Sequence, residues 1–353
     1  MIKIGLIILA FTFSINGIAQ NIVDVYGVDH KEGEYLIKKY SAEISIIERE
    51  MQDEFKKTNA NIDAVKITQL KKEKLKEEIK KYGSFSYVDI NTIYYPANKN
   101  YYSTIEIINH DQADRRRFLD NTKPQKYPLK NDLINKMIVF RNMEFKLILT
   151  NQLNVEKIPC PVYHCVTAFT HPQLKPWLAI FNTGVINERK LILETLNTDP
   201  NPERRAAAAF LIGHFHDPKE IISLLLPHVT DSNSGVRNNV MRVIGATLFK
   251  AKINTINVQP FIDLLDSPET TDRNKALYIL LGAVDSPLSK KLVIQQAGKK
   301  LLALLELKQP NNHDISYEIL KKVSGKDFGD TNSSLWKDWL SHQKSENIEN
   351  DRK

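Results

Sequence analysis

The sequence predicts a mainly α-helical fold, an α-solenoid of stacked helical hairpins that follows a small α+β domain. Three observations lead to this prediction. The chain has 353 residues, which exceeds the usual size of one domain. Its second half repeats one helical pattern, and the glycines that close the copies, Gly213, Gly245, Gly282 and Gly325, follow one another at steps of 32, 37 and 43 residues. Its first third alternates strand-like and helix-like patterns instead.

The first 19 residues have the pattern of a secretory signal peptide. Lys3 gives a minimal positive start before an apolar stretch that runs from Ile4 to about Phe13. Gly17 and Ala19 then supply the small residues that precede a cleavage site, so we expect cleavage after Ala19. The protein is therefore expected to be exported, to the periplasm or outside the cell. An apolar core of roughly ten residues is short for a membrane span, so no integral membrane segment is expected after cleavage; a retained anchor is the alternative.

The charge of the chain gives little indication of a polyanionic partner. Lysine and arginine number 49 against 42 aspartates and glutamates, a formal net charge of +7, and both signs are spread along the whole chain. Such a balance attracts polyanions only weakly. Nucleic acid is therefore not an expected partner.

Residues 20–110 are predicted to form the α+β domain, in the order strand, helix, helix, strand, strand. An apolar alternation from Asn21 precedes a helix with apolar residues every three or four positions. A lysine-rich helix and two strand-like runs, 84–95 and 101–109, follow. This order resembles a POTRA module, and the matching residues are Val23, Val25, Gly27, Gly83, Phe85, Val88, Ile105 and Ile107. The resemblance implies binding of extended polypeptides by strand addition to a sheet edge; an unrelated α+β domain would fit the same pattern.

Residues 111–172 are predicted to connect the two parts, mainly through one helix. The two cysteines of the chain, Cys160 and Cys165, lie in this segment. Export makes a local disulfide between them the leading interpretation. The alternative adds His164 and His171 and gives a zinc site of two cysteines and two histidines.

Residues 173–325 carry the repeated pattern. The stretch DPNPERRAAAAFLIG, 199–213, aligns with DSNSGVRNNVMRVIG, 231–245, in kind as well as in position. Looser third and fourth copies follow, and a second helical pattern with leucine or isoleucine at helical spacing lies between successive copies. The small side chains of Ala206 to Ala209 favour a helix and let neighbouring helices approach closely. A generic helical bundle is the alternative.

These copies resemble HEAT repeats, including the HEAT-like variety associated with phycobilisome lyases. The resemblance is carried by the aspartate turns, by an arginine, and by the face of small residues that ends in glycine. It implies a structural ladder of side chains between neighbouring repeats, formed by Asp199, Arg205, Asp231 and Arg237. The third and fourth copies have Asn274 and Tyr317 in place of the arginine, so the ladder is expected to fade toward the C-terminus.

Residues 326–342 are predicted to cap the array. Trp336 and Trp339, three residues apart, fall on one helical face, and an array of repeats needs a cover for its last open core. The final segment, 343–353, is polar and is predicted to be a disordered tail.

The sequence contains no G-x-S-x-G, no H-E-x-x-H, no P-loop and no dinucleotide fingerprint. We therefore expect a non-enzymatic protein without a cofactor, a scaffold that presents the concave or edge surface of its stacked helices to a protein partner. Nothing in the sequence indicates which protein that is. The alternative, implied by the lyase association, is an enzyme or enzyme accessory with a site around Cys160, His164, Cys165 and His171.

Overall fold

The computed structural model describes most of the chain after the expected cleavage site. The described residues are 20–55, 57, 61–95, 98–119, 125, 127–128, 130–150, 152–153 and 160–350, with the backbone alone at 55, 62, 149 and 344–350. The predicted signal peptide and its cleavage site after Ala19 lie outside them.

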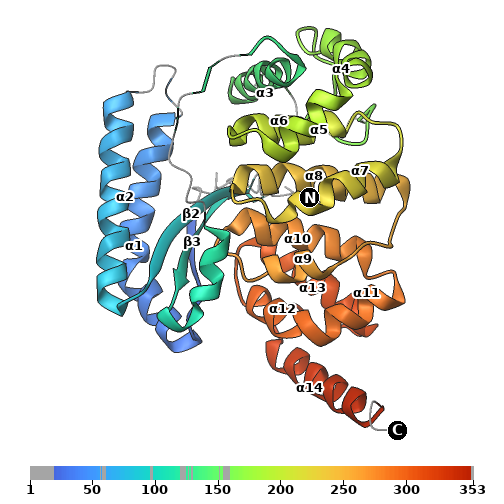
Figure 1. Ribbon diagram of the computed structural model, residues 1–353. Coiled ribbons are helices and arrows are strands. Elements are labelled where there is room, and N and C mark those ends of the chain that lie inside the picture. The colour runs from blue at the N-terminus through green and yellow to red at the C-terminus, as the bar shows by residue number, and fades with distance from the viewer. Residues whose placement is uncertain are drawn as a thin grey trace, which may run out of the picture.

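The first part of the chain forms the predicted α+β domain. Its elements are β1 (Asn21–Tyr26), α1 (His30–Phe55), α2 (Ile62–Gly83), β2 (Tyr87–Tyr95) and β3 (Asn100–Ile108), in the expected order of strand, helix, helix, strand, strand. The sheet order is β1-β3-β2, with β1 parallel and β2 antiparallel to the central β3. Helices α1 and α2 cover one face of this sheet (Figure 1).

The core of this domain follows from the two hydrophobic periods of the sequence. The inward stripe of α1 includes Leu36, Tyr40 and Ile44, whose side chains are at most 2% exposed. They belong to one buried cluster with Ile105 and Ile107 of β3. Because successive side chains of a strand point to opposite faces, the residue between these isoleucines, Glu106, faces away from the helices.

The rest of the chain forms a row of stacked helices, as Figure 1 shows from top to bottom. A 3-10 helix, η1 (His110–Phe118), leads from the sheet to it. The elements of the row are α3 (Leu133–Leu149), α4 (Lys175–Asn187), α5 (Arg189–Thr198), α6 (Pro202–Ile212), α7 (Pro218–Leu225), η2 (Leu226–Thr230), α8 (Ser234–Ala251), α9 (Gln259–Leu264), α10 (Thr270–Ala283), α11 (Pro287–Leu292), η3 (Val293–Ala297), α12 (Gly298–Leu305), α13 (Pro310–Ser324) and α14 (Ser333–Asn350).

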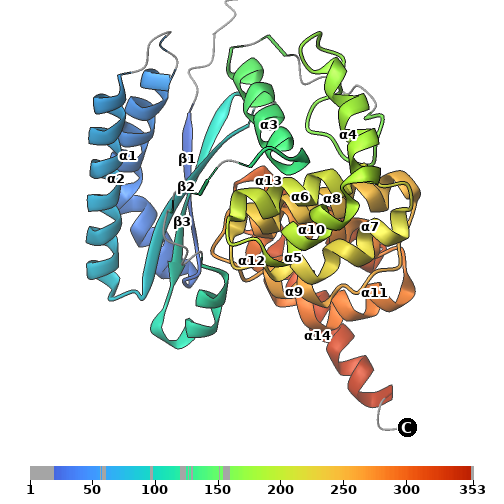
Figure 2. The ribbon, with the colours of Figure 1, turned by 45° about the horizontal axis from the view of Figure 1, so that its top comes forward.

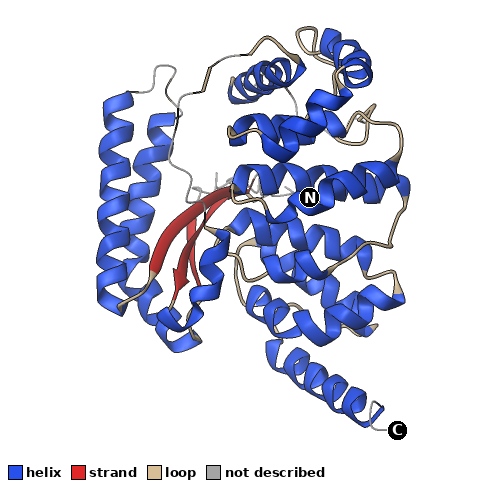
Figure 3. Ribbon diagram, in the orientation of Figure 1, coloured by secondary structure: helices blue, strands red, loops and turns tan. Residues whose placement is uncertain are grey.

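Successive hairpins pack in a line rather than around one centre. The second helices of the hairpins, α6, α8, α10 and α13, pack each on the next, and the first helices α5, α7, α9 and α12 pack against them. Ala207, Ala208 and Ala209 of α6 are at most 4% exposed, which fits the role predicted for small side chains. The predicted α-solenoid is confirmed, and Figure 3 shows that strands occur only in the first domain of the part described.

The repeat glycines do not all end helices, contrary to the simple pattern of one helix and then a glycine. Helix α8 continues past Gly245 to Ala251. A Cβ atom on Gly245 would lie 3.0 Å from the ring of Tyr278 in α10, so this glycine permits close helix packing instead. Gly325 does end its helix, α13, with a φ of +68°.

Both ends of the row are covered. At the first end α3 packs on α6, so the helix predicted as a connector is part of the array. At the other end Trp336 of α14 is fully buried and its Nε1 donates to the Gly329 carbonyl oxygen at 2.8 Å, as expected of a cap. Helix α14 then continues to Asn350, so the prediction of a disordered tail from 343 is wrong as far as that residue.

Among the described residues, no helix has the length and apolar character needed to cross a membrane.

Candidate interaction surface

The aspartate and arginine side chains of the hairpin turns join neighbouring repeats. Arg205 donates from Nε and Nη2 to the two carboxylate oxygens of Asp231, at 2.9 and 2.8 Å. Arg237 repeats this contact one layer further and donates twice to Asp272, at 2.9 and 2.7 Å. Asp199 accepts from Arg204 at 2.8 Å. Arg205, Asp231 and Arg237 therefore make contacts between neighbouring repeats, as the resemblance implied. Asp199 instead contacts an arginine of its own turn.

The ladder changes chemistry toward the C-terminus, where a single amide hydrogen bond replaces the ion pair between neighbouring repeats. Asn274, in the arginine position, donates through its side-chain amide to the Asn311 carbonyl oxygen of the next hairpin, at 3.0 Å. The arginine of this repeat is instead Arg273, one residue earlier. Its side chain points away from the array and donates to both carboxylate oxygens of Glu106, at 2.6 and 2.9 Å.

Glu106 belongs to β3, so this contact joins the two domains. Both side chains of the pair are 0% exposed, and Thr270 donates a third hydrogen bond to the same carboxylate at 2.6 Å. Asp24 of β1 adds a second link, because it accepts from the backbone nitrogens of Lys308 and Gln309 just before α13 begins. A carboxylate in that position stabilises a helix N-terminus.

We call this side of the array the turn edge: the hairpin turns that contain Asp199, Asp231, Ser267 and Gln309. The sheet lies between α1 and α2 on one side and the turn edge on the other, as Figures 1 and 2 both show. Arg115 of η1 also contacts the turn edge, through its Nε and the Asp266 carbonyl oxygen. The second face of the sheet is therefore occupied within the molecule.

Sequence reasoning missed the partner of Arg273. The only signal was a glutamate between two isoleucines in a strand, which placed a carboxylate opposite the helix-covered face. The sequence did not indicate which group would pair with this carboxylate.

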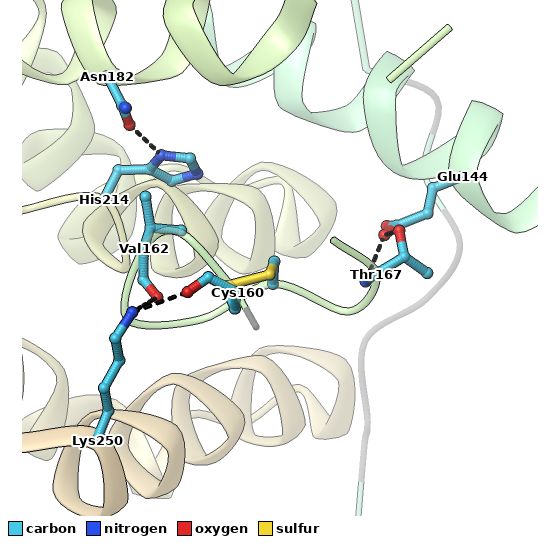
Figure 4. Close-up of a disulfide and its surroundings, with 8 residues drawn as sticks. Glu144, Cys160, Val162, Thr167, Asn182, His214 and Lys250 are labelled. Atoms are coloured by element: carbon cyan, nitrogen blue, oxygen red, sulfur yellow. Dashed lines mark hydrogen bonds between the residues drawn. A yellow bond between two sulfur atoms is a disulfide. The ribbon is translucent and has the colours of Figure 1, made fainter. Parts of the chain in front are cut away.

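The predicted cysteine pair is a disulfide, and its loop is fastened to the array. Cys160 and Cys165 are joined by a disulfide bond. Lys250 of α8 donates to the carbonyl oxygens of Cys160 and Val162, at 2.8 and 2.7 Å (Figure 4). The Tyr163 backbone nitrogen donates to the Gly213 carbonyl oxygen at 3.0 Å. The loop therefore lies across the ends of α6 and α8.

The structure does not assemble the alternative site from these cysteines and the two histidines. His164 stacks on Phe210, with ring centroids 4.9 Å apart, and burial lowers the pKa of its imidazole to about 3. His171 accepts at Nδ1 from the Gln173 backbone nitrogen. Cys165 and His164 line a cavity of only about 20 Å³, which is room for about one water. Within the described residues no three of His, Cys, Asp and Glu converge to hold a metal ion.

His214 is a structural residue of the core. Its Nδ1 lies 2.8 Å from the Asn182 side-chain oxygen (Figure 4), and burial lowers the pKa of its imidazole to about 4. The ring is therefore neutral at pH 7 and packs edge-on against Phe169 and Phe181.

The face of the array formed by α6, α8, α10 and α13, away from the first helices, is the second-helix face. Phe249 is 78% exposed there and Tyr278 is 46% exposed. They line a hollow of about 630 Å³, and the other apolar or glycine residues around it are Gly245, Leu248, Ile253, Ile279, Leu281 and Gly282. A hollow of this volume lined by apolar side chains is typical of a binding site for another molecule.

Comparison with known proteins identifies the repeats. The family model for HEAT repeats matches residues 190–282, which contain most of α5 and α10 and all elements between them. No curated protein and no solved structure matches the chain. No match supports the POTRA resemblance of the first domain, which stays a prediction. The C-terminal half of this chain is therefore a HEAT-repeat array, joined to a small three-stranded α+β domain.

Proposed function

We propose that this protein is an exported, non-enzymatic scaffold that binds another protein through its second-helix face, in the periplasm or outside the cell. The observation that carries the proposal is the apolar hollow around Phe249 and Tyr278. HEAT repeats are in general protein-interaction scaffolds, and stacked repeats present extended surfaces for that purpose. The turn edge does not serve in this way, because the α+β domain occupies it.

Two observations support export. The N-terminal sequence has the charge, the apolar core and the small residues of a signal peptide. The disulfide between Cys160 and Cys165 is of a kind that persists in oxidising compartments and is rare in a reducing cytosol.

Expression of the 353-residue chain from Met1 tests the location. Fractionation of a Gram-negative host, followed by N-terminal sequencing and thiol labelling, should give a chain that starts at Gln20, lies outside the cytoplasm and has no reactive thiol. A cytoplasmic chain that retains Met1 and labels at both cysteines would contradict export.

Crosslinking capture from the intact cell envelope tests the binding surface. We expect Phe249→Asp to abolish capture of the protein that the wild type retains, because a charge would be placed in the apolar hollow. Leu288→Asp is the matched control, since Leu288 is 69% exposed but lies on α11, outside the second-helix face. Equal capture by both variants and the wild type would refute this assignment of the surface.

A further inference from the structure

We propose that the second-helix face binds an extended acidic segment of its protein partner. Arg242 and Lys275 bind carboxylates of that segment, and the hollow beside Tyr278 accepts a neighbouring apolar side chain. This inference rests on the proposed scaffold function and adds the chemistry of the partner.

Two fixed contacts place Arg242 and Lys275 side by side. Arg237 of α8 binds Asp272 of α10, and two turns later Gly245 lies against Tyr278. The two helices therefore run in the same direction, and both cations fall between these contacts. Arg242 is three residues before Gly245 in α8, and Lys275 is three residues before Tyr278 in α10. Residues three apart lie on the same face of a helix, so each cation is one turn N-terminal to a residue that lines the hollow.

These cations have no carboxylate partner among the described residues. Lys275 donates only to the side-chain oxygen of Asn274, at 2.8 Å, and Arg242 makes no hydrogen bond or ion pair there. Both side chains are half-buried. Burial, together with the charge of Arg242, lowers the pKa of the Lys275 ammonium to about 8, and burial lowers that of Arg242 as well. A bound carboxylate would relieve this unfavourable arrangement.

Neighbouring charges do not neutralise the pair. Arg141 of α3 forms an ion pair with Glu144, and His164 is neutral at pH 7. Lys250 is held by the disulfide loop. On the far side of the hollow Lys322 of α13 is paired with Asp285, at 2.9 Å. The net charge between α8 and α10 is therefore positive, and the ligand that complements it is an anion.

The shape of the surface favours a peptide over a free small anion. From Arg242 on α8 to Lys322 on α13 the face crosses two helix spacings, and packed helices lie about 8–10 Å apart. The face is thus roughly 20 Å long, which about six residues of extended chain would cover. Gly245 and Tyr278 line the hollow, and each lies one helical turn from one of the two cations. The acidic and apolar side chains of the ligand must therefore be close together.

Fluorescence anisotropy with a labelled six-residue peptide tests the inference. The probe alternates glutamate with leucine or phenylalanine, and the control peptide has glutamine for each glutamate. We expect the purified protein to bind the glutamate peptide at least tenfold more tightly, with an affinity that falls as salt is raised. Arg242→Glu and Lys275→Glu should each weaken binding at least tenfold. Lys190→Glu is the control, because the Lys190 side chain is 90% exposed on α5, away from this face.

Several outcomes would overturn the inference. Equal binding of the two peptides would show that carboxylates are not recognised. Unchanged peptide binding by both Arg242→Glu and Lys275→Glu would show that these two residues do not bind the carboxylates. Competition by phosphatidylglycerol vesicles or single-stranded DNA, lost in the same variants, would assign the cations to a lipid or a nucleic acid instead.

Folding and function are separated by two further measurements. Arg242→Gln and Lys275→Gln should weaken peptide binding without lowering the melting temperature, which identifies a loss of contacts and not of structure. If Arg242→Glu captures the envelope partner as well as the wild type while Phe249→Asp captures nothing, only this inference fails. If the wild type captures no protein, the scaffold function itself fails.

Discussion

The turn edge and the second-helix face differ in how their buried and half-buried cations are paired. On the turn edge Arg205, Arg237 and Arg273 each receive a carboxylate, from the next repeat or from the α+β domain. On the second-helix face Arg242 and Lys275 receive none among the described residues, and apolar rings stand exposed beside them. Removing the carboxylate of a buried ion pair destabilises the protein, whereas adding a carboxylate beside an unpaired cation is favourable. The difference indicates that the turn edge holds the molecule together and that the second-helix face is available for binding.

The largest effect is expected at the pair that joins the two domains. Arg273→Met leaves the Glu106 carboxylate buried and unpaired, so we expect the free energy of unfolding to fall by about 3–5 kcal/mol. Urea denaturation monitored by circular dichroism measures this change in the free energy of unfolding. The double variant Glu106→Leu with Arg273→Met removes both charges and should recover much of the loss. If Arg273→Met alone costs less than about 1 kcal/mol, the turn edge is not the stabilising contact we infer.

A smaller, pH-dependent effect is expected at Glu269, a carboxyl on the turn edge whose charged form is disfavoured by burial. Burial, reinforced by the negative charge of Asp272, raises its pKa to about 7 from an ordinary 4.5. Because the folded pKa is the higher one, its contribution to stability is fully present below about pH 4.5 and is lost as pH rises through 7.

Glu269→Gln should therefore stabilise the protein by on the order of 2 kcal/mol at pH 8 and have little effect at pH 4.5. Thermal melts of the variant and the wild type at the two pH values provide the comparison. A gain of the same size at both would attribute the effect to something other than the ionisation of this carboxyl.

The disulfide loop lies across the ends of α6 and α8, so its removal tests whether the second-helix face depends on it. Cys160→Ser with Cys165→Ser should lower the free energy of unfolding by about 2 kcal/mol, since the closed loop is short. Partner capture should persist, because the bound surface is built from helices. Loss of capture with an unchanged melting temperature would favour the alternative, in which these cysteines form a functional site.

The smallest effect is expected at the unpaired cations. Arg242→Gln should change the free energy of unfolding by less than about 0.5 kcal/mol, in contrast to Arg273→Met, because no ion pair is broken. Denaturation of both variants under one set of conditions makes the contrast direct. A large loss at Arg242 would mean that the guanidinium has a structural partner after all.

Much of the fold could be predicted because it depends on local periodicity. The stripe of Leu36, Tyr40 and Ile44 specifies one buried face of a helix without reference to the rest of the chain. The same holds for the repeat pattern, since aligned aspartates and arginines occur at nearly constant spacing. The helix after Gly245 was not predicted, because a glycine weakens a helix locally and only packing against Tyr278 shows why it is tolerated.

The candidate binding site was less predictable. Arg242 and Lys275 are single cations on two helices, and sequence spacing alone does not say that no carboxylate lies beside them. The sequence predicted Arg237 as a ladder residue because an arginine and an aspartate recur at matching positions of the repeats. Its partner, Asp272, could not be chosen from the acidic residues of the next repeat.

By itself, the sequence determined an array of helical hairpins, a βααββ domain before it and a cysteine pair close enough to bond, because each of these is a short-range pattern. Only the tertiary structure decided that β3 meets the hairpin turns, where Glu106 and Arg273 are 167 residues apart in the chain. It also decided which face of the array stays open. The physical reason is that the pairing of buried charges depends on which surfaces come together in space, and the chain order of the charged residues does not specify it.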